Sequence, residues 1–149
     1  YATARLAGHP VIGLIVGKAM SGAFLAHGYQ ANRLIAINDR GVMIHAMGKA
    51  SAARITLRTV EELEKLASTI PPMAYDIANY KTLGLLEDLI DVADPVHPTA
   101  VEVENARNAV LRAIESTRAG GVTLSNRLGS PNRASTSLVR ERMREQWRE

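Results

Sequence analysis

Small residues follow a short apolar run near the start of the chain, in the segment Gly17–Phe24. The run Val11–Val16 is typical of a strand buried on both faces, and a helix is predicted to begin near Gly22. Backbone N–H groups at a helix start lack intrahelical partners and lie at the positive end of the helix dipole. Because Ser21, Gly22 and Ala23 are small, an anionic oxygen can approach these groups, which is how an oxyanion hole is built. Tight packing between a strand and a helix selects the same small residues, so the spacing alone leaves both interpretations open.

Further residues are candidates for contact with a substrate at this site, namely Lys18, Met20, His45 and Lys49. Lys18 can reach a carboxylate, although a lysine at the end of a strand more often extends into solvent. His45 and Lys49 flank Gly48, where another helix is predicted to begin, and they line either a cleft or a subunit interface. The predicted catalytic residues are therefore Gly22, Ala23 and Ser21.

Several kinds of chemistry are disfavoured by what the sequence lacks. There is no cysteine, which excludes disulfides, thiolate metal sites and a cysteine nucleophile and favours a reducing cytoplasm. The four histidines show no metal-binding spacing, so no metal site is expected. Neither a nucleophile elbow nor a phosphate-binding loop motif is present, and no sequence neighbour is placed to activate the Ser21 hydroxyl.

The elements that must position these residues are short strands followed by helices. Strands are predicted at Val11–Val16, Arg33–Ile37 and Val42–Ala46, with a turn at Gly17–Gly22 and a helix at Ala23–Ala31. This order favours an α/β fold with parallel strands and right-handed crossovers. Three short strands are few for such a sheet, so further residues or a partner chain are expected to complete it.

The remainder of the chain is predicted to be mostly helical. Capping boxes at Thr59–Glu62 and Thr99–Glu102 each predict a helix start. The apolar residues of the stretch 77–90 are spaced as one helical face, and Gly120–Gly121 ends the helix that follows the second box. After a loop over 126–133, a last helix is expected from about residue 135 to the end.

The net charge of +3 lies in the C-terminal tail. Acidic and basic residues balance over 1–121, whereas 122–149 holds six arginines and three glutamates. Ion pairs at helical spacing, Glu141 with Arg144 and Glu145 with Arg148, favour a solvated helix over a nucleic-acid site. We therefore predict a main domain at 1–121 and a basic loop and helix at 122–149. The longest apolar stretch, Val11–Leu25, is too short and too interrupted to span a bilayer, and no signal-peptide pattern is present.

Three segments in order carry a family resemblance. The segment Lys18–Phe24 resembles the Lys-Ala-Tyr-Gly-Gly-Ala-Tyr motif of biotin-dependent carboxyltransferases, within a strand-and-glycine-turn pattern of the crotonase superfamily. Gly17–Gly28, Val42–Arg54 and Ile70–Asn79 together are similar to the gamma subunit of biotin-independent malonate decarboxylase. The specific resemblance runs over about His9–Leu86 and is only general beyond it.

The resemblance implies a crotonase-like, carboxyltransferase-type spiral that is incomplete in this chain, with a helical C-terminal region. It implies a beta subunit of the same fold, an acyl carrier protein and the other subunits of a complex as partners, with no nucleic acid and no membrane. The implied reaction decarboxylates a malonyl thioester to an acetyl thioester and CO₂. No directly bound cofactor and no biotin are expected, because the substrate is carried on the carrier's phosphoribosyl dephospho-coenzyme A group.

The same resemblance suggests two roles for Gly22. In crotonases the matching residue supplies half of an oxyanion hole for the thioester oxygen, whereas in carboxyltransferases the matching pair, here Gly22 and Ala23, faces the carboxyl carrier. Leu25 stands where hydratases of the superfamily carry a catalytic glutamate, which argues against water addition. Met20 and Ser21 stand where carboxyltransferases favour tyrosine and glycine, which argues against a biotin-dependent carboxyltransferase subunit. A non-catalytic scaffold subunit is the remaining alternative.

Overall fold

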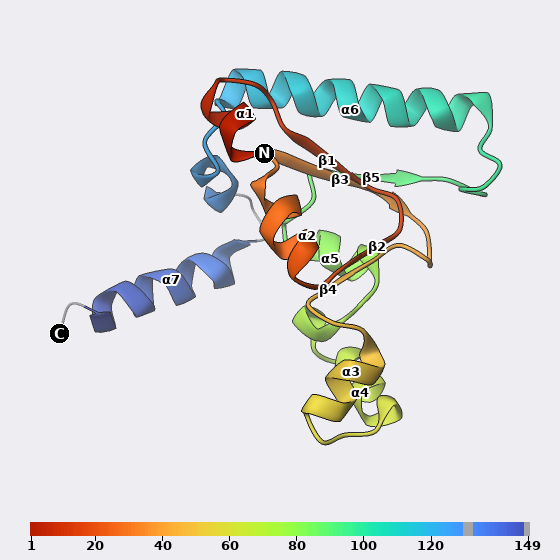
Figure 1. Cartoon of the computed structure of the whole chain (residues 1–149), viewed down its shortest axis with the longest axis vertical. Helices are drawn as coiled ribbons and strands as arrows, with labels where there is room; N and C mark the ends of the chain where they lie inside the picture. Colours follow the sequence, from red (N-terminus) through yellow and green to blue (C-terminus); the bar gives the residue numbers. More distant parts are fainter. Residues whose placement is uncertain (130–132, 148–149) are drawn as a thin grey trace.

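Two parallel sheets form the centre of the computed structural model, which describes residues 1–129 and 133–147 (Figure 1). The three-stranded sheet has the order β1-β3-β5, with β1 at Ile12–Ile15, β3 at Arg33–Asn38 and β5 at Asp88–Asp91. The two-stranded sheet pairs β2 (Lys18–Met20) with β4 (Met43–His45). All three strand pairings are parallel, which confirms the predicted parallel α/β class.

The chain alternates between the two sheets. It passes from β1 to β2, returns through helix α2 (Ser21–His27) to β3 beside β1, and then enters β4 beside β2. Each time the chain passes through both sheets, it thus adds one strand to each of them. The central strand β3 is buried on both faces, because Leu34, Ile35 and Ala36 are at most 1% exposed. This burial explains the continuous apolar run in its sequence.

The two faces of β3 contact different helices. Ile35 and Ile90 pack against Ala109 and Ala113 of the long helix α6 (Ala100–Gly120), which Figure 1 shows lying along the three-stranded sheet. On the opposite face, Leu34 and Ala36 pack with Ile77 and Tyr80 of helix α5 (Ile77–Thr82). Successive side chains of a strand point to opposite faces, so alternate residues serve the two helical layers.

The remaining helices flank this core. They are α1 (Ala2–Leu6), α3 (Lys49–Ile55), α4 (Val60–Ala67) and α7 (Ala134–Trp147), with 3₁₀ turns η1 (Gly28–Gln30), η2 (Pro71–Met73) and η3 (Ser125–Gly129). Both predicted capping boxes are confirmed, since Thr59 and Thr99 accept from the Glu62 and Glu102 N–H groups while each glutamate accepts from its threonine N–H. In Figure 1 the α3–α4 pair extends from one end of the molecule, and α7 projects from its side.

Two predicted elements were wrong, and a predicted helix was confirmed with different bounds. The turn predicted at Gly17–Gly22 contains strand β2, which at three residues is too short to show a period in the sequence. The helical face predicted across 77–90 ends at Thr82, because Gly84 adopts φ +69° and the chain continues into β5. The helix predicted at Ala23–Ala31 begins at Ser21 and gives way to the tighter turn η1 after His27.

The last helix is confirmed at Ala134–Trp147. Within the described residues Glu141 and Arg144 form no ion pair, and both stay exposed. The predicted pair of Glu145 with Arg148 lies outside the described residues, as does part of the predicted loop over 126–133, whose first half forms η3. None of the described helices is long and apolar enough to cross a membrane.

Candidate functional site

Two parallel strands bring the candidate residues to one edge. Met20, the last residue of β2, lies opposite His45, the last residue of β4. Helix α2 begins at the next residue, Ser21, and α3 begins at Lys49 after a short connection. Since parallel strands share a carboxyl edge, the starts of both helices lie on the same side of the two-stranded sheet. All the candidate residues except Lys18 are thus grouped near this edge.

The start of α2 is open to a ligand. Met20 precedes the helix in an extended conformation and makes no capping hydrogen bond with its side chain. Ser21, Gly22 and Ala23 are exposed, and a Cβ atom placed on Gly22 would meet no atom within 4 Å. The space beside the Gly22 Cα is therefore unobstructed at the helix start, where the oxyanion interpretation places a ligand.

Ser21 adopts φ +68°, which non-glycine residues rarely do. A serine in this region carries backbone strain of order 1 kcal/mol, and such strain is concentrated at functional turns. The conformation lets the chain pass from β2 into α2 without an intervening loop.

His45 is held against an aromatic ring. Its imidazole stacks on Tyr75, with ring centroids 3.9 Å apart and planes inclined by 8°. Burial lowers the pKa of His45 below its ordinary value of 6.5, so the neutral ring is favoured at neutral pH. The Met47 N–H lies 3.5 Å from Nδ1, and in the tautomer that accepts this contact Nε2 carries the proton. His45 in that form is a neutral hydrogen-bond donor.

Lys49 lies over the same tyrosine ring. Its Nζ lies 5.5 Å from the centroid of Tyr75 and 2.7 Å from Glu64 Oε1. The half-exposed ion pair fixes the ammonium between α3 and α4. Lys49 is therefore partly neutralised, which weakens its attraction for a substrate carboxylate.

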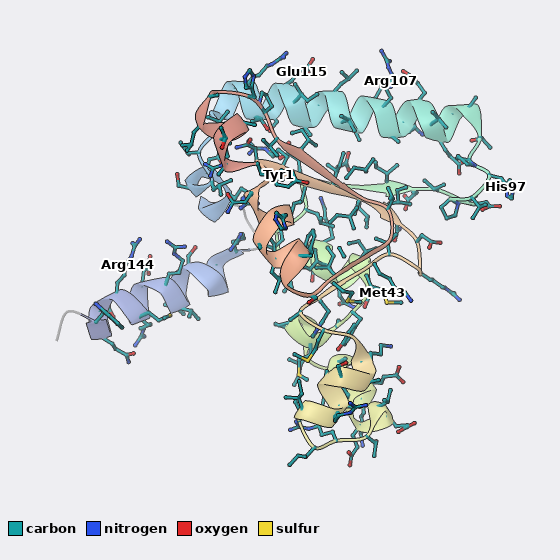
Figure 2. The ribbon with its side chains drawn as sticks, viewed as in Figure 1. Tyr1, Met43, His97, Arg107, Glu115 and Arg144 are labelled. Carbon is teal, nitrogen blue, oxygen red and sulfur yellow. The ribbon has the colours of Figure 1, made fainter. Side chains whose placement is uncertain are left out.

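A pocket of about 590 Å³ lies beside this group. It is lined by Arg40, Met43, Lys49, Glu64, Ala67, Ser68, Ala74, Tyr75, Asp76 and Asn79. Figure 2 labels Met43 between the sheets and the α3–α4 pair. Of the predicted site residues only Lys49 lines the pocket. The residues of the α2 start are outside it, so the structure places the candidate residues in two adjoining groups.

Lys18 and Met20 occupy different positions from the rest. Lys18 is exposed at the amino end of β2, opposite Met43, and so lies away from the edge where α2 begins. Met20 is partly buried against the cluster of Ala52, Ala53, Leu63 and Tyr75, which makes it a packing residue beneath the site.

Sequence reasoning missed Tyr75 and Arg40. Tyr75 is 6% exposed, yet it is the surface on which His45 and Lys49 are organised. It lies within the segment Ile70–Asn79 that carried the resemblance, but no spacing pattern distinguishes a buried functional tyrosine from a core one.

Among the described residues no group of His, Asp or Glu could hold a metal ion.

The parallel α/β fold is one that a solved transcarboxylase shares. Transcarboxylase 12S, solved as a hexamer, shares the fold at a TM-score of 0.51 and 20% identity, over 77% of this chain and 21% of that one. The sequence shows the family, because the family model described as the malonate decarboxylase gamma subunit matches residues 1–147 of this chain. The chain belongs to the malonate decarboxylase gamma subunit family.

The chain is also similar to two known proteins. It is 58% identical to a chain of a Pseudomonas malonate decarboxylase hetero-tetramer solved with coenzyme A, with a TM-score of 0.88 over 99% of this chain and 56% of that one. It is 36% identical over 118 residues to a Malonyl-S-ACP:biotin-protein carboxyltransferase of Malonomonas rubra, covering 78% of this chain and 37% of the relative. The chain thus spans about half, or less, of the length of these relatives.

Proposed function

We propose that this chain acts as a gamma subunit in a hetero-complex that decarboxylates a malonyl thioester. The proposal includes a beta subunit and an acyl carrier protein that carries the substrate on its phosphoribosyl dephospho-coenzyme A group, in the cytoplasm and without biotin. The observation that carries it is the exposed, unobstructed start of α2 at Gly22, within a chain of this family. The alternation of the chain between two parallel sheets further supports a crotonase-like spiral.

The proposed chemistry requires anion stabilisation and little else. When the bond between the α-carbon and the carboxylate breaks, CO₂ leaves and its bonding electron pair moves into the thioester as an enolate. Protonation of the enolate at carbon then gives the acetyl thioester. The N–H groups of Gly22 and Ala23 interact more strongly with a developing negative charge than with the neutral substrate, which lowers the barrier. Loss of one such donor typically costs about 10²–10³ in rate.

Gly22 and Ala23 serve one of two ends of the substrate. They hold either the thioester oxygen, as in crotonases, or the carboxylate and departing CO₂, as the carboxyltransferase resemblance implies. Ser21 supports the same position, because its positive φ lets β2 pass directly into α2 and so places Gly22 at the helix start. His45, as a neutral donor one strand away, is suited to hydrogen-bond a carboxylate oxygen without neutralising its charge.

The substrate-binding roles of Lys18, Met20 and Lys49 are weaker within this proposal. Lys49 shares its charge with Glu64, and Met20 faces the apolar cluster under the site. Lys18 lies at the opposite end of β2 and reaches a substrate only if the ligand extends along that strand.

Carboxyl transfer is the second candidate function. It is favoured by the similarity to the Malonomonas rubra relative, which is named as a carboxyltransferase that acts on a biotin protein. The two functions differ in the fate of the carboxyl group, since a transferase retains it on an acceptor whereas a decarboxylase releases it. Release of CO₂ without a biotin acceptor distinguishes them.

The test is decarboxylation of malonyl-coenzyme A by the full-length protein with its beta subunit, comparing Gly22→Val with Gly17→Val. Both glycines have no atom within 4 Å of an added Cβ, so neither change disturbs the packing of this chain. We expect Gly22→Val to lower kcat/KM by about 10²-fold or more, because the side chain occupies the space in front of the amides. The matched Gly17→Val variant keeps most of the activity.

Assembly is followed by size-exclusion chromatography, so that loss of the complex is separated from loss of catalysis. Full activity of an assembled Gly22→Val complex, or of the beta subunit alone, would leave this chain with a scaffold role and refute the site assignment.

A further inference from the structure

Tyr75 is anchored to the strand that ends in His45. Its carbonyl accepts from the Ile44 N–H at 3.3 Å, and the next residue, Asp76, forms an antiparallel bridge with Met43. Successive N–H groups of a strand point to opposite edges, so β4 lies between β2 and this segment. The backbone of Tyr75 is thus fixed relative to His45, the residue that follows Ile44.

The ring of Tyr75 is also fixed by its packing. It belongs to the apolar cluster that Ala52 and Ala53 of α3 form with Leu63 of α4, and it is buried there. Side chains in a close-packed cluster keep one rotamer on average, because other rotamers collide with their neighbours. Tyr75 therefore presents a plane of fixed position and direction to the ring stacked on it.

The stack constrains the imidazole plane and leaves its edge free. The small angle of 8° between the planes lays His45 flat on the Tyr75 ring. Imidazole nitrogens donate and accept hydrogen bonds in the plane of their ring, so a contact on the face does not occupy them. Nδ1 lies near the Met47 N–H, and Nε2 lies across the ring from that contact. The Tyr75 ring can therefore set the direction of the Nε2–H bond without binding to it.

The hydroxyl of Tyr75 is poorly suited to proton transfer. Burial raises its pKa above the ordinary value of 10.0, and the charge of Lys49 opposes that rise. A phenol of this kind stays neutral near pH 7. Among the described residues the hydroxyl has no hydrogen-bond partner. These properties indicate that the ring, and not the hydroxyl, is the part of Tyr75 that acts on the site.

The neutral state of His45 depends on burial. The charged residues on the elements around the stack include Lys18, Arg40, Lys49, Glu64 and Asp76. Lys49 pairs with Glu64 at 2.7 Å, and Asp76 caps α5. Burial lowers the pKa of His45, and the contact with the Met47 N–H opposes this change. Because the Tyr75 ring covers one face of the imidazole, its removal lets water reach His45.

We propose that Tyr75 is a positioning residue, whose ring holds the His45 imidazole so that Nε2 donates into the space at the carboxyl edge of β2 and β4. The inference rests on the proposed decarboxylation and adds a residue to it. A neutral donor orients the substrate carboxylate but stabilises its charge less than a cation would, which leaves the ground state reactive. Position matters because a displacement of about 1 Å can cost about 10²-fold in rate.

The experiment is a double-mutant cycle of Tyr75→Leu and His45→Gln. Decarboxylation of malonyl-coenzyme A is measured with the full-length protein assembled with its beta subunit, and size-exclusion chromatography follows the assembly of each variant. Leucine keeps apolar packing but removes the aromatic plane. Tyr75→Phe keeps the plane and loses only the hydroxyl. The control is Leu63→Ala, which disturbs the same cluster outside the stack.

We expect Tyr75→Leu to lower kcat/KM by about tenfold or more, and Tyr75→Phe by less than about twofold. In the His45→Gln background, Tyr75→Leu is expected to lower it by less than about twofold further, because the ring acts through His45. Leu63→Ala keeps most of the activity. The proposal is overturned if Tyr75→Leu is fully active, if its loss equals that of Leu63→Ala or Tyr75→Phe, or if its loss persists undiminished in His45→Gln.

The pH profile of kcat/KM gives a second readout, which a purely structural role would not move. In Tyr75→Leu the imidazole is better solvated, so its pKa rises toward 6.5 and activity begins to fall at a higher pH than in the unsubstituted complex. Tyr75→Phe keeps the original profile. An unmoved profile in an active Tyr75→Leu complex refutes the role of Tyr75 alone, whereas an unsubstituted complex that releases no CO₂ refutes the proposed function and this inference together.

Discussion

At the scale of single residues, the site depends on a neutral histidine held by stacking. His45 lies parallel to Tyr75 at 3.9 Å, and Lys49 lies on the same ring system at 5.5 Å. Protonation of His45 would place a charge in a partly buried position, so it costs more in the folded protein than in the unfolded chain. The arrangement therefore links the protonation of one side chain to stability.

The linkage has a definite sign. The folded pKa of His45 is lowered below 6.5, so between that folded value and 6.5 the unfolded chain binds the proton more readily than the folded protein. The stability that neutral His45 contributes is present above about pH 6.5 and is lost as the pH falls toward the folded pKa. The pKa values of four carboxyl groups are also lowered, from ordinary values of 4.5 or below, in Glu61, Asp76, Asp94 and Glu102. These groups therefore gain protons at a lower pH than the range just below 6.5 that concerns His45.

We expect His45→Gln to reduce the fall in Tm between pH 7 and pH 5.5. Glutamine keeps a polar side chain but has no proton to gain in this range. Thermal unfolding of the full-length protein at both pH values measures the effect, with His9→Gln as the control at an exposed position. An unchanged pH dependence in His45→Gln would show that His45 is not the titrating group.

At the scale of elements, the capping boxes of α4 and α6 differ in one contact. Glu62 accepts only from the Thr59 N–H within its own box. Glu102 accepts from Thr99 and also, at 2.6 Å, from the Ala93 N–H in the loop after β5. The second contact joins α6 to the strand it covers and holds the pKa of the Glu102 carboxyl below its usual value.

Glu102→Ala should therefore lower Tm more than Glu62→Ala does. Both variants lose a reciprocal cap, but only Glu102→Ala also frees the loop that leads from β5 into α6. Thermal unfolding at neutral pH compares them, and the gap is expected to narrow below pH 4 as Glu102 is protonated in the unsubstituted protein. Equal losses would mean that the Ala93 contact contributes nothing to stability.

These elements also show how far the sequence alone could lead. The capping boxes were predictable because Thr and Glu at that spacing satisfy local backbone groups. Strands β2 and β5 were not, because Lys18–Met20 is too short for a pattern and Leu86, Leu89 and Ile90 fit helix and strand alike. The start of α2 was located to within one residue, since small residues after a buried strand indicate a strand-to-helix transition.

The site was predictable only in part for a related physical reason. The sequence indicates which backbone groups are unpaired, but it does not say which strands pair. The contact of Met20 with His45 depends on the β2–β4 register. The stacking of His45 on Tyr75 and the convergence of Arg127, Arg133 and Arg140 likewise join segments far apart in the chain. Such contacts follow from tertiary packing and leave no local pattern.

At the scale of the whole molecule, one buried side chain joins the two ends of the described core. Asn32 is 0% exposed, at the start of β3. Its Oδ1 accepts from the Val11 N–H at 2.9 Å, and its Nδ2 donates to the Val122 carbonyl at 2.8 Å. Asn32 thus connects the entry to β1 with the segment that follows α6.

Asn32→Ala is expected to lower the free energy of unfolding by about 2–4 kcal/mol, because it leaves a buried donor and a buried acceptor without partners. Asn32→Asp keeps the acceptor for Val11 but replaces the donor to Val122 with a buried charge, so it should not restore stability. The control is Asn38→Ala on the same strand, where the exposed bond to Asp91 contributes under about 1 kcal/mol. Urea unfolding measures all three variants. If Asn32→Ala proves as mild as Asn38→Ala, contacts other than those of Asn32 must hold the segment after α6 in place.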